Sequence, residues 1–473
     1  MDNGTEMTDP LILVGVGILI VVGSIVGLRL HPFLALVLGT IFVALLTGDD
    51  HLRQYAGSRE FSSEETEALL TTTVGSRIST AFGSTIGRLG ILIAMASIIA
   101  SALYRSGGAD RIIRSLLKVT GEKYAPVAFL IGSFTLGIPV FFDTVFYLMY
   151  PLARTMAVRT GKNYGLYLMA IIGGGVMSHS LVPPTPGPMY MAAELNVNMG
   201  LMILMGLFVG LFTVGGGYLY ALWNNRRHPL AVPTADADQT AETSEKDLPP
   251  LWMSLLPILL PVVLISGSTI LQLLREGDAI RVSDGVVSFF KIAGNSNLAL
   301  SIAAGIALLL LITTKGKRAI KGNVSEGLQD AGVIILIIGA GGAFGAMMEQ
   351  TGISSRISGM FSLDTVAVLP VIFIISALVR TAQGSATVAM ITTVGMVSGL
   401  AADLPFHPVY IAIVIGCGSK IFNWMNDSSF WIICKMSGMT EKETFRNNSV
   451  MLTVMGIVGL FISMILASLL PLK

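Results

Sequence analysis

Residues 178–188 read SHSLVPPTPGP and interrupt an otherwise apolar stretch that runs from Tyr164 to Asn196. The four prolines of this segment lack backbone donors and clash with preceding carbonyls, so the stretch cannot be helical throughout. Residues 416–428, GCGSKIFNWMNDS, interrupt a second apolar stretch in the other half of the chain. The two segments predict a pair of broken helices, one in each half.

The rest of the sequence alternates between long apolar runs and short charged stretches. Charged residues make up only 12% of the 473 residues, whereas a soluble domain usually carries about 25%. A membrane-spanning helix needs roughly 20 mainly apolar residues. Runs of about this length are Leu11–Leu30, Pro32–Leu46, Ile86–Leu103, Leu201–Trp223, Leu251–Leu274, Leu298–Ile312, Ala331–Met348 and Met451–Leu470. We therefore expect an all-α polytopic protein of the lipid bilayer.

Composition and motifs argue against several other classes of protein. The net charge is +1, and no basic stripe is present that would bind a nucleic acid. Cys417 and Cys434 lie in apolar stretches without metal-ligand spacing. Residues 339–345, GAGGAFG, resemble a dinucleotide-binding loop but lie within an apolar run. Close packing of helices through small residues explains them better. We expect no enzymatic activity, no catalytic residue, no cofactor and no metal site.

The two halves of the chain share landmarks. Residues 102–108, ALYRSGG, and 346–352, AMMEQTG, each follow an apolar run, at an offset of 244 residues. A polar segment separates the halves. We expect a first membrane repeat over 1–223, a cytoplasmic linker over 224–250 and a second membrane repeat over 251–473.

Basic residues predict the orientation of these repeats, because cytoplasmic loops favour Lys and Arg. Residues 105–123 hold five basic residues and 315–321 hold four, whereas 350–363 hold only Arg356. Matching segments therefore face opposite sides, as inverted-topology repeats require. Each repeat would also contain a re-entrant hairpin, the first over 124–152, although two full spans remain an alternative in each place.

Charged side chains accompany the breaks. Asp143 ends a kinked segment, GIPVFFD (137–143), and Arg380 begins the predicted tip of the second hairpin, RTAQGS (380–385). Irregular backbone at membrane depth is tolerated where it lines a cavity, and charges there are rare and usually functional. The N-termini of half-helices also favour anions. The breaks therefore predict a binding site for a small anion.

Each of these residues has alternative roles. Asp143 could cap a half-helix or carry a coupling proton or cation. Arg380 could pair with a membrane carboxylate such as Asp143 or Asp427, or it could contact the substrate. Lys420 could reach the membrane interface or contact the substrate, and His179 could bond a freed carbonyl or take a proton. Neutral side chains that could satisfy broken backbone or bind substrate hydroxyls are Thr185, Gln383, Ser385, Asn423, Asn426 and Ser428.

The broken segments resemble a known family. Residues 178–188 are similar to the His-Ser-x-x-Pro-Pro-x-Pro-Gly-Pro signature of the gluconate:proton symporter (gluconate permease) family. Residues 380–387, RTAQGSAT, and 426–431, NDSSFW, resemble that family's motifs in the second half. The resemblance runs from about Ile91 to the C-terminus.

The resemblance implies a secondary transporter of the ion-transporter superfamily, a bacterial inner-membrane location and a homodimer. It implies sugar acids and related hydroxy acids as substrates, chiefly gluconate, with glycerate or D-serine as alternatives. Three departures are notable: Asp143 replaces an expected Glu, Lys420 replaces an expected Asn, and the polar insert Asp49–Thr73 is long.

We therefore expect symport of gluconate or a related acid with protons by alternating access. Arg380 and Lys420 would hold the carboxylate, and Asp143, Asp427 or His179 would take the proton. Sodium coupling is an alternative, and an anion channel is a remote one.

Overall fold

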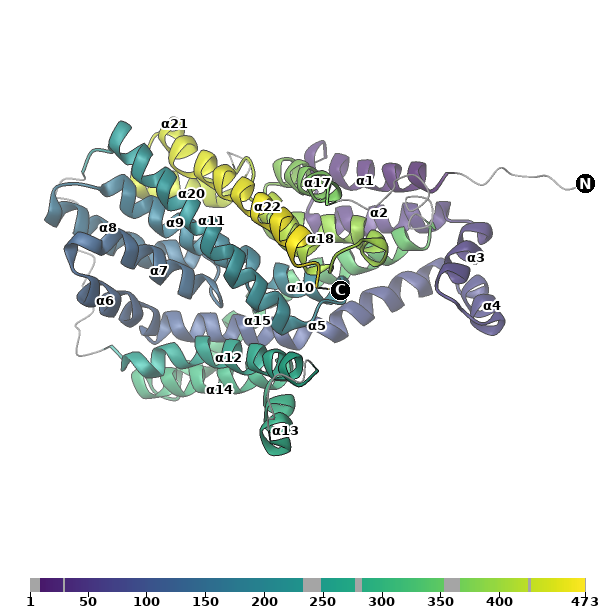
Figure 1. Ribbon diagram of the computed structural model, residues 1–473, viewed down its shortest axis with the longest axis horizontal. Coiled ribbons are helices and arrows are strands. Elements are labelled where there is room, and N and C mark those ends of the chain that lie inside the picture. The colour runs from purple at the N-terminus through teal and green to yellow at the C-terminus, as the bar shows by residue number, and fades with distance from the viewer. Residues whose placement is uncertain are drawn as a thin grey trace, which may run out of the picture.

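The computed structural model describes residues 9–28, 30–232, 248–276, 283–352, 366–423 and 427–472. These residues form helices and connecting turns, and no strand occurs among them (Figure 1). Seven helical segments are long and apolar enough to cross a membrane, or up to eight if the bent pair α2 (Pro32–Leu46) and α3 (Asp49–Ser58) counts as one. The predicted all-α membrane architecture is confirmed.

The helices of the first half follow the predicted apolar runs. Besides α2 and α3 they are α1 (Pro10–Val26), α4 (Ser63–Thr71), α5 (Val74–Arg105), α6 (Gly108–Thr120), η1 (Glu122–Tyr124), α7 (Ala125–Gly137), α8 (Phe142–Thr160), α9 (Tyr164–Leu181), α10 (Pro186–Glu194) and α11 (Met199–Arg227). The polar insert forms α3 and α4, which project at one end of the molecule (Figure 1).

The second half has a similar order of elements. They are α12 (Leu251–Glu276), α13 (Asp284–Ala293), α14 (Ser296–Lys315), α15 (Ala319–Glu349), α17 (Val368–Gln383), α18 (Ala386–Val397), η3 (Ser398–Asp403), α19 (Val409–Gly418), α20 (Ser428–Ser437), α21 (Glu441–Thr444), a π-helical turn η4 (Phe445–Val450) and α22 (Met451–Leu469).

All four predicted breaks interrupt the helices. The breaks separate α7 from α8, α9 from α10, α17 from α18 and α19 from α20. α7 (13 residues), α17 (16 residues) and α18 (12 residues) are shorter than the roughly 20 residues that a full span needs. α8 has 19 residues but is not among the helices that are both long and apolar enough to cross a membrane. Their lengths favour the re-entrant hairpins over two full spans.

Corresponding elements make corresponding contacts in the two halves. Ser133 of α7 donates to the carbonyl oxygen of Ala170 in α9 (3.3 Å), and Ser376 of α17 donates to that of Ile415 in α19 (2.8 Å). Between the halves, α8 contacts α20 and α10 contacts α18, while α5 packs on α15 and α11 on α22. The corresponding pairs α8–α20 and α10–α18, and the pairing of α5 with α15 and of α11 with α22, are the contacts expected between two related repeats.

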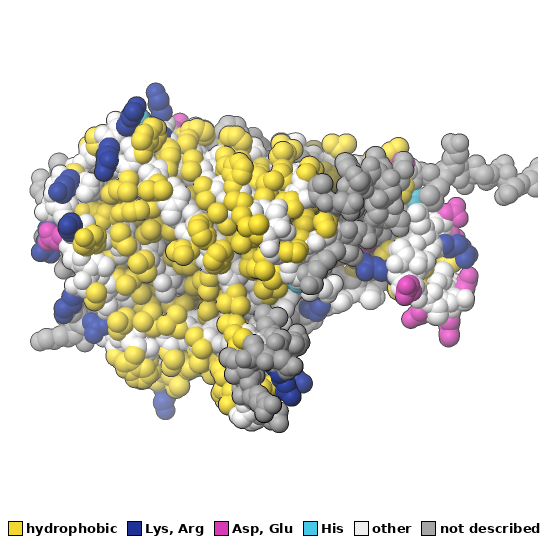
Figure 2. All heavy atoms as spheres, viewed as in Figure 1, with side chains coloured by type: hydrophobic (Ala, Val, Ile, Leu, Met, Phe, Trp, Pro, Cys, Tyr) yellow, Lys and Arg dark blue, Asp and Glu magenta, His cyan; other side chains and the backbone are white. Residues whose placement is uncertain are grey.

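The outer surface suits a lipid environment. Figure 2 shows apolar side chains covering most of one face, with Lys and Arg gathered at the end of the molecule opposite α3 and α4. Large apolar side chains on long helices are exposed, including Leu211 and Leu219 of α11, Val263 of α12 and Phe461 of α22. A soluble protein rarely exposes so large a contiguous apolar area.

Candidate functional site

Glycines bring three of the four breaks against one another. A Cβ on Gly416 of α19 would lie 2.7 Å from the carbonyl oxygen of Ser180, in the last turn of α9. A Cβ on Gly137, where α7 ends, would lie 2.3 Å from the Oγ of Ser178. Only a residue without a side chain permits these approaches. The last turn of α9 therefore lies between the first hairpin and the interrupted crossing of the second half.

Arg380 and Asp427 form an ion pair at the centre of this region. Arg380, in the last turn of α17, is 1% exposed, and its Nη2 donates to Oδ2 of Asp427. The other carboxylate oxygen of Asp427 accepts the backbone N–H of Ser429 (2.7 Å) and so caps α20. Of the two carboxylates that the sequence offered to Arg380, the structure places Asp427 in contact with it.

The guanidinium of Arg380 is only partly used by this contact. Its Nε and Nη1 are buried and have no hydrogen-bond partner among the described residues. Leaving a buried donor unpaired costs about 1–3 kcal/mol, and more when the group is charged. A planar guanidinium with free donors matches the geometry of a carboxylate. An organic acid could bond to the nitrogens that have no partner among the described residues.

Three further charged or titratable side chains lie near this pair: Lys420, Asp143 and His179. Lys420, 4% exposed, follows α19 and interacts electrostatically with Arg380, Asp427 and His179. Asp143 lies in the first turn of α8, close enough to Asp427 for their carboxylates to interact. The structure therefore brings together every charged residue that the sequence indicated, from all four breaks.

His179 lies at the edge of the same region, in the last turn of α9. Its Nδ1 is buried and has no hydrogen-bond partner in the described part of the chain, and its ring packs against Phe141 with ring centroids 5.6 Å apart. Among the described residues, no carbonyl freed by the break accepts a hydrogen bond from this nitrogen.

The neutral candidates either bond the broken backbone, keep an unpaired polar atom, or have side chains that the structure does not describe. Thr185 donates to the carbonyl oxygen of Val182 (2.8 Å) and satisfies broken backbone. Ser385 caps α18 by accepting the N–H of Val388 (3.4 Å). Asn423 donates to Ser429 (3.4 Å) while its own Oδ1 has no partner among the described residues. The structure describes the backbone of Gln383 and Ser428 without their side chains, and Asn426 lies outside the described residues.

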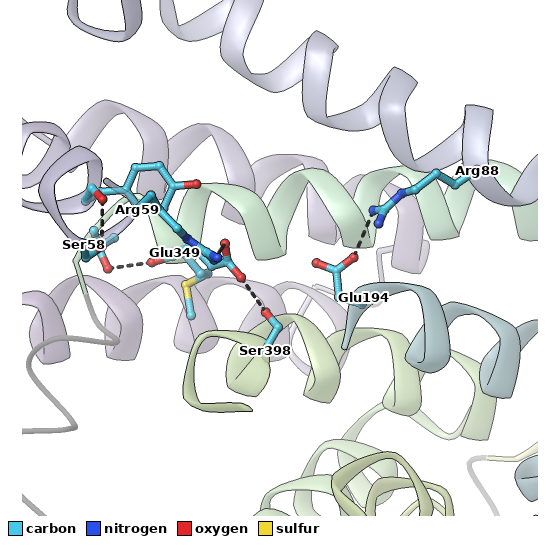
Figure 3. Close-up of polar contacts among 9 residues, drawn as sticks. Ser58, Arg59, Arg88, Glu194, Glu349 and Ser398 are labelled. Carbon is cyan, nitrogen blue, oxygen red and sulfur yellow. Dashed lines mark hydrogen bonds and ion pairs between the residues drawn. The ribbon is translucent and has the colours of Figure 1, made fainter. Parts of the chain in front are cut away.

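A second polar cluster lies at the far end of α10 and was not predicted (Figure 3). Arg88 of α5 contacts Glu194, the last residue of α10, and Arg59 contacts Glu349, the last residue of α15 (2.8 Å). Ser398 donates to the other oxygen of Glu349 (3.2 Å). Each of two long apolar segments ends in a carboxylate, Glu194 or Glu349, and this pattern in the sequence could have indicated the cluster.

Comparisons with known proteins identify the family of the chain. Residues 66–470 match the family model described as GntP family permease. The chain is 31% identical to an uncharacterised permease of Haemophilus influenzae over 91% of this chain and 86% of that protein. It is 30% identical to a gluconate permease of Zymomonas mobilis over 98% of each chain. A low-affinity gluconate transporter of Escherichia coli K12 is 28% identical over 97% of this chain and 98% of its own.

Solved structures share the fold at much lower identity. The YdaH transporter of Alcanivorax borkumensis superimposes with a TM-score of 0.58 at 14% identity, covering 87% of this chain and 91% of that one. MtrF of Neisseria gonorrhoeae gives a TM-score of 0.60 at 15% identity, covering 85% of each chain. The sequence matches show that this protein is a transporter and belongs to the GntP family of permeases.

Proposed function

We propose that the protein is a secondary active transporter that moves gluconate or a related sugar acid together with protons by alternating access. The relatives named gluconate permease support the choice of substrate. A relative named inner membrane permease supports a bacterial inner-membrane location. The two repeats, 1–223 and 251–473, would move around the shared site, and the assembly would be a homodimer.

The observation that carries this proposal is the Arg380 guanidinium. It is fully buried, it is neutralised by Asp427, and two of its nitrogens have no partner among the described residues. A charged group inside a membrane protein that is left partly unsatisfied is a binding group by default. Arg380, with Lys420, would hold the substrate carboxylate, and Asn423 and Thr185 would contact its hydroxyls along with Gln383, Ser385, Asn426 and Ser428.

Charge balance supplies a reason for coupling to protons. The site contains two cations, Arg380 and Lys420, and two carboxylates, Asp427 and Asp143. A monovalent acid that enters this balanced set would leave one uncompensated negative charge in a region of low dielectric, which is costly. Protonation of Asp143 removes that charge. One proton would therefore enter with each acid anion, and His179 or Asp427 would be the alternative proton carriers.

The experiment is uptake of labelled D-gluconate into proteoliposomes, with an inward proton gradient, with a sodium gradient and with neither. The proposal predicts accumulation above equilibrium with the proton gradient, abolished by a protonophore. Accumulation of gluconate with the sodium gradient alone would mean that sodium, and not the proton, is the coupling ion. Flux that runs downhill and never accumulates gluconate under any gradient would indicate an anion channel.

Competition with unlabelled acids identifies the substrate. Glycerate, other aldonates and D-serine are added in excess during gradient-driven uptake. We expect aldonates to compete most strongly, because they carry several hydroxyls for polar side chains such as Asn423, whose Oδ1 has no partner among the described residues. Strong competition by D-serine with none by aldonates would contradict the assignment of a sugar acid.

A further inference from the structure

Glu194 has an unusual environment for a carboxylate. It is the last residue of α10, its side chain is 10% exposed, and its only described charged contact is Nη2 of Arg88 at 3.4 Å. Arg88 also donates to the carbonyl oxygen of Ala193 (3.3 Å), and its own side chain is 46% exposed. The C-terminal end of a helix carries negative partial charge, which disfavours an anion there.

A buried hydroxyl lies beside this carboxylate. Tyr190 is one helical turn before Glu194 on the same side of α10 and is 0% exposed. Its hydroxyl group has no hydrogen-bond partner in the described residues, although it lies within electrostatic range of Glu194. A buried hydroxyl is almost always hydrogen-bonded, so an unpaired one needs an explanation.

One glycine of α15 makes space for Glu194. A Cβ on Gly345 would lie 3.2 Å from Oε1 of Glu194, a tight approach that glycine avoids. Gly341 lies four residues earlier on the same face of the helix. A Cβ there would lie 2.1 Å from Cγ2 of Ile391, whereas the Tyr190 hydroxyl would be at an ordinary contact distance of 3.6 Å. α15 thus provides room for Glu194 at Gly345 and lies in contact with Tyr190 at Gly341.

Glu349 is the matched comparison. It also ends a long helix, but Arg59 donates to one of its oxygens (2.8 Å) and Ser398 to the other (3.2 Å), as Figure 3 shows. Among the described residues, the charged groups that act on Glu194 are Arg88 from α5 and Glu349 from α15. A carboxylate with a described partner on each oxygen therefore acts on one that is enclosed and poorly paired.

We propose that the carboxyl group of Glu194 binds the transported proton, with the Tyr190 hydroxyl as its hydrogen-bonding partner. This inference rests on the proposed proton symport and adds a second proton site to it. α10 begins at the break beside the candidate anion site and ends at Glu194, so one helix of nine residues connects the two. Gain or loss of the proton at one end of α10 would change the position of this helix at the other.

The test separates substrate movement from proton coupling. Proteoliposomes containing the whole protein are assayed for gluconate counterflow at equal pH on both sides, and for accumulation under an inward proton gradient. Counterflow requires substrate binding and the conformational change but no net proton movement. We expect Glu194→Gln to keep counterflow and to lower the gradient-driven accumulation ratio to the equilibrium value. Glu122→Gln is the control, because Glu122 forms an exposed ion pair with Arg159 away from this cluster, and it should keep both.

Conservative variants show whether the effect is due to titration. Tyr190→Phe removes only a hydroxyl group, and Glu194→Asp keeps a titratable group that is one methylene shorter. We expect both to accumulate gluconate, with the pH of half-maximal uptake shifted from that of the wild type. If Glu194→Gln lowers counterflow and accumulation in the same proportion, or accumulates like the wild type, the inference is wrong. If Glu194→Gln does not fold, an unshifted pH profile in both conservative variants overturns it instead.

These outcomes differ from failure of the proposed function itself. If the wild type does not accumulate gluconate under a proton gradient, proton symport is wrong before any variant is compared. If the wild type accumulates and Glu194→Gln accumulates equally, symport stands and the role of Glu194 does not.

Discussion

Arg380 and Asp427 lie 47 positions apart in the chain and form an ion pair where α17 ends and α20 begins. Each residue has polar atoms that the ion pair does not use. Asp427 caps α20 through the N–H of Ser429, which fixes its carboxylate, while two nitrogens of Arg380 stay free of described partners. The pair therefore holds a cation in place without consuming its binding capacity.

Arg380→Ala tests the anion clamp. Hydrogen bonds to charged groups contribute about 1.5–3 kcal/mol each, so we expect the KM for gluconate to rise about tenfold or more. Arg159→Ala is the control, because Arg159 forms an exposed ion pair with Glu122 and such pairs contribute about 0–1 kcal/mol. Unchanged KM in a folded Arg380→Ala protein would contradict the assignment.

Asp143→Asn imitates the protonated state of this carboxyl group. We expect the variant to bind and exchange gluconate without dependence on pH, because the site then has a permanent net positive charge. Accumulation driven by a proton gradient should be lost. Counterflow and accumulation in proteoliposomes measure the two properties. Normal accumulation by Asp143→Asn would assign the coupling proton to Asp427, His179 or Glu194 instead.

Lys420→Gln tests whether the second cation helps to select an acid. The substitution keeps a long polar side chain in a buried position and removes its charge. We expect a higher KM for aldonates and glycerate, and weaker discrimination against D-serine, whose amino group would no longer face Lys420. The measurement is competition against labelled gluconate uptake across the three compounds. An unchanged order of competitors would assign Lys420 a structural role.

Gly206→Ala tests the packing that positions the first break. A Cβ at Gly206 of α11 would lie 2.1 Å from the carbonyl oxygen of Leu181, where α9 ends. Overpacking of this kind costs about 1–3 kcal/mol, so thermal unfolding in detergent should occur at a lower temperature. Gly215→Ala, on the same helix, meets nothing within 4 Å and should be neutral or stabilising by up to about 1 kcal/mol. Equal stability of the two variants would contradict the close approach of α11 to this break.

The sequence predicted the breaks well because their causes are local. Prolines at 183, 184, 186 and 188 lack the N–H that a helix needs, and glycines such as Gly384 adopt a positive φ of 77° that ends one. The apolar runs likewise follow from composition. Both kinds of signal are visible without knowledge of the partner elements.

The pairing of charges could not be predicted in the same way. Which carboxylate meets Arg380 depends on how α17 and α20 pack, and the sequence left Asp143 and Asp427 as equal choices. The contact between Arg88 and Glu194 joins residues 106 positions apart on α5 and α10. No local pattern marks such a pair, so this cluster emerged only from the packed structure.

Simultaneous measurement of both fluxes tests most directly whether one proton enters with each acid anion. Proteoliposomes that contain a pH-sensitive dye receive external gluconate, with no imposed ion gradient and with membrane potential clamped. We predict that the lumen acidifies as labelled gluconate enters, in proportion to it, and that Arg380→Ala lowers both signals together. Gluconate entry without proton entry would contradict the account.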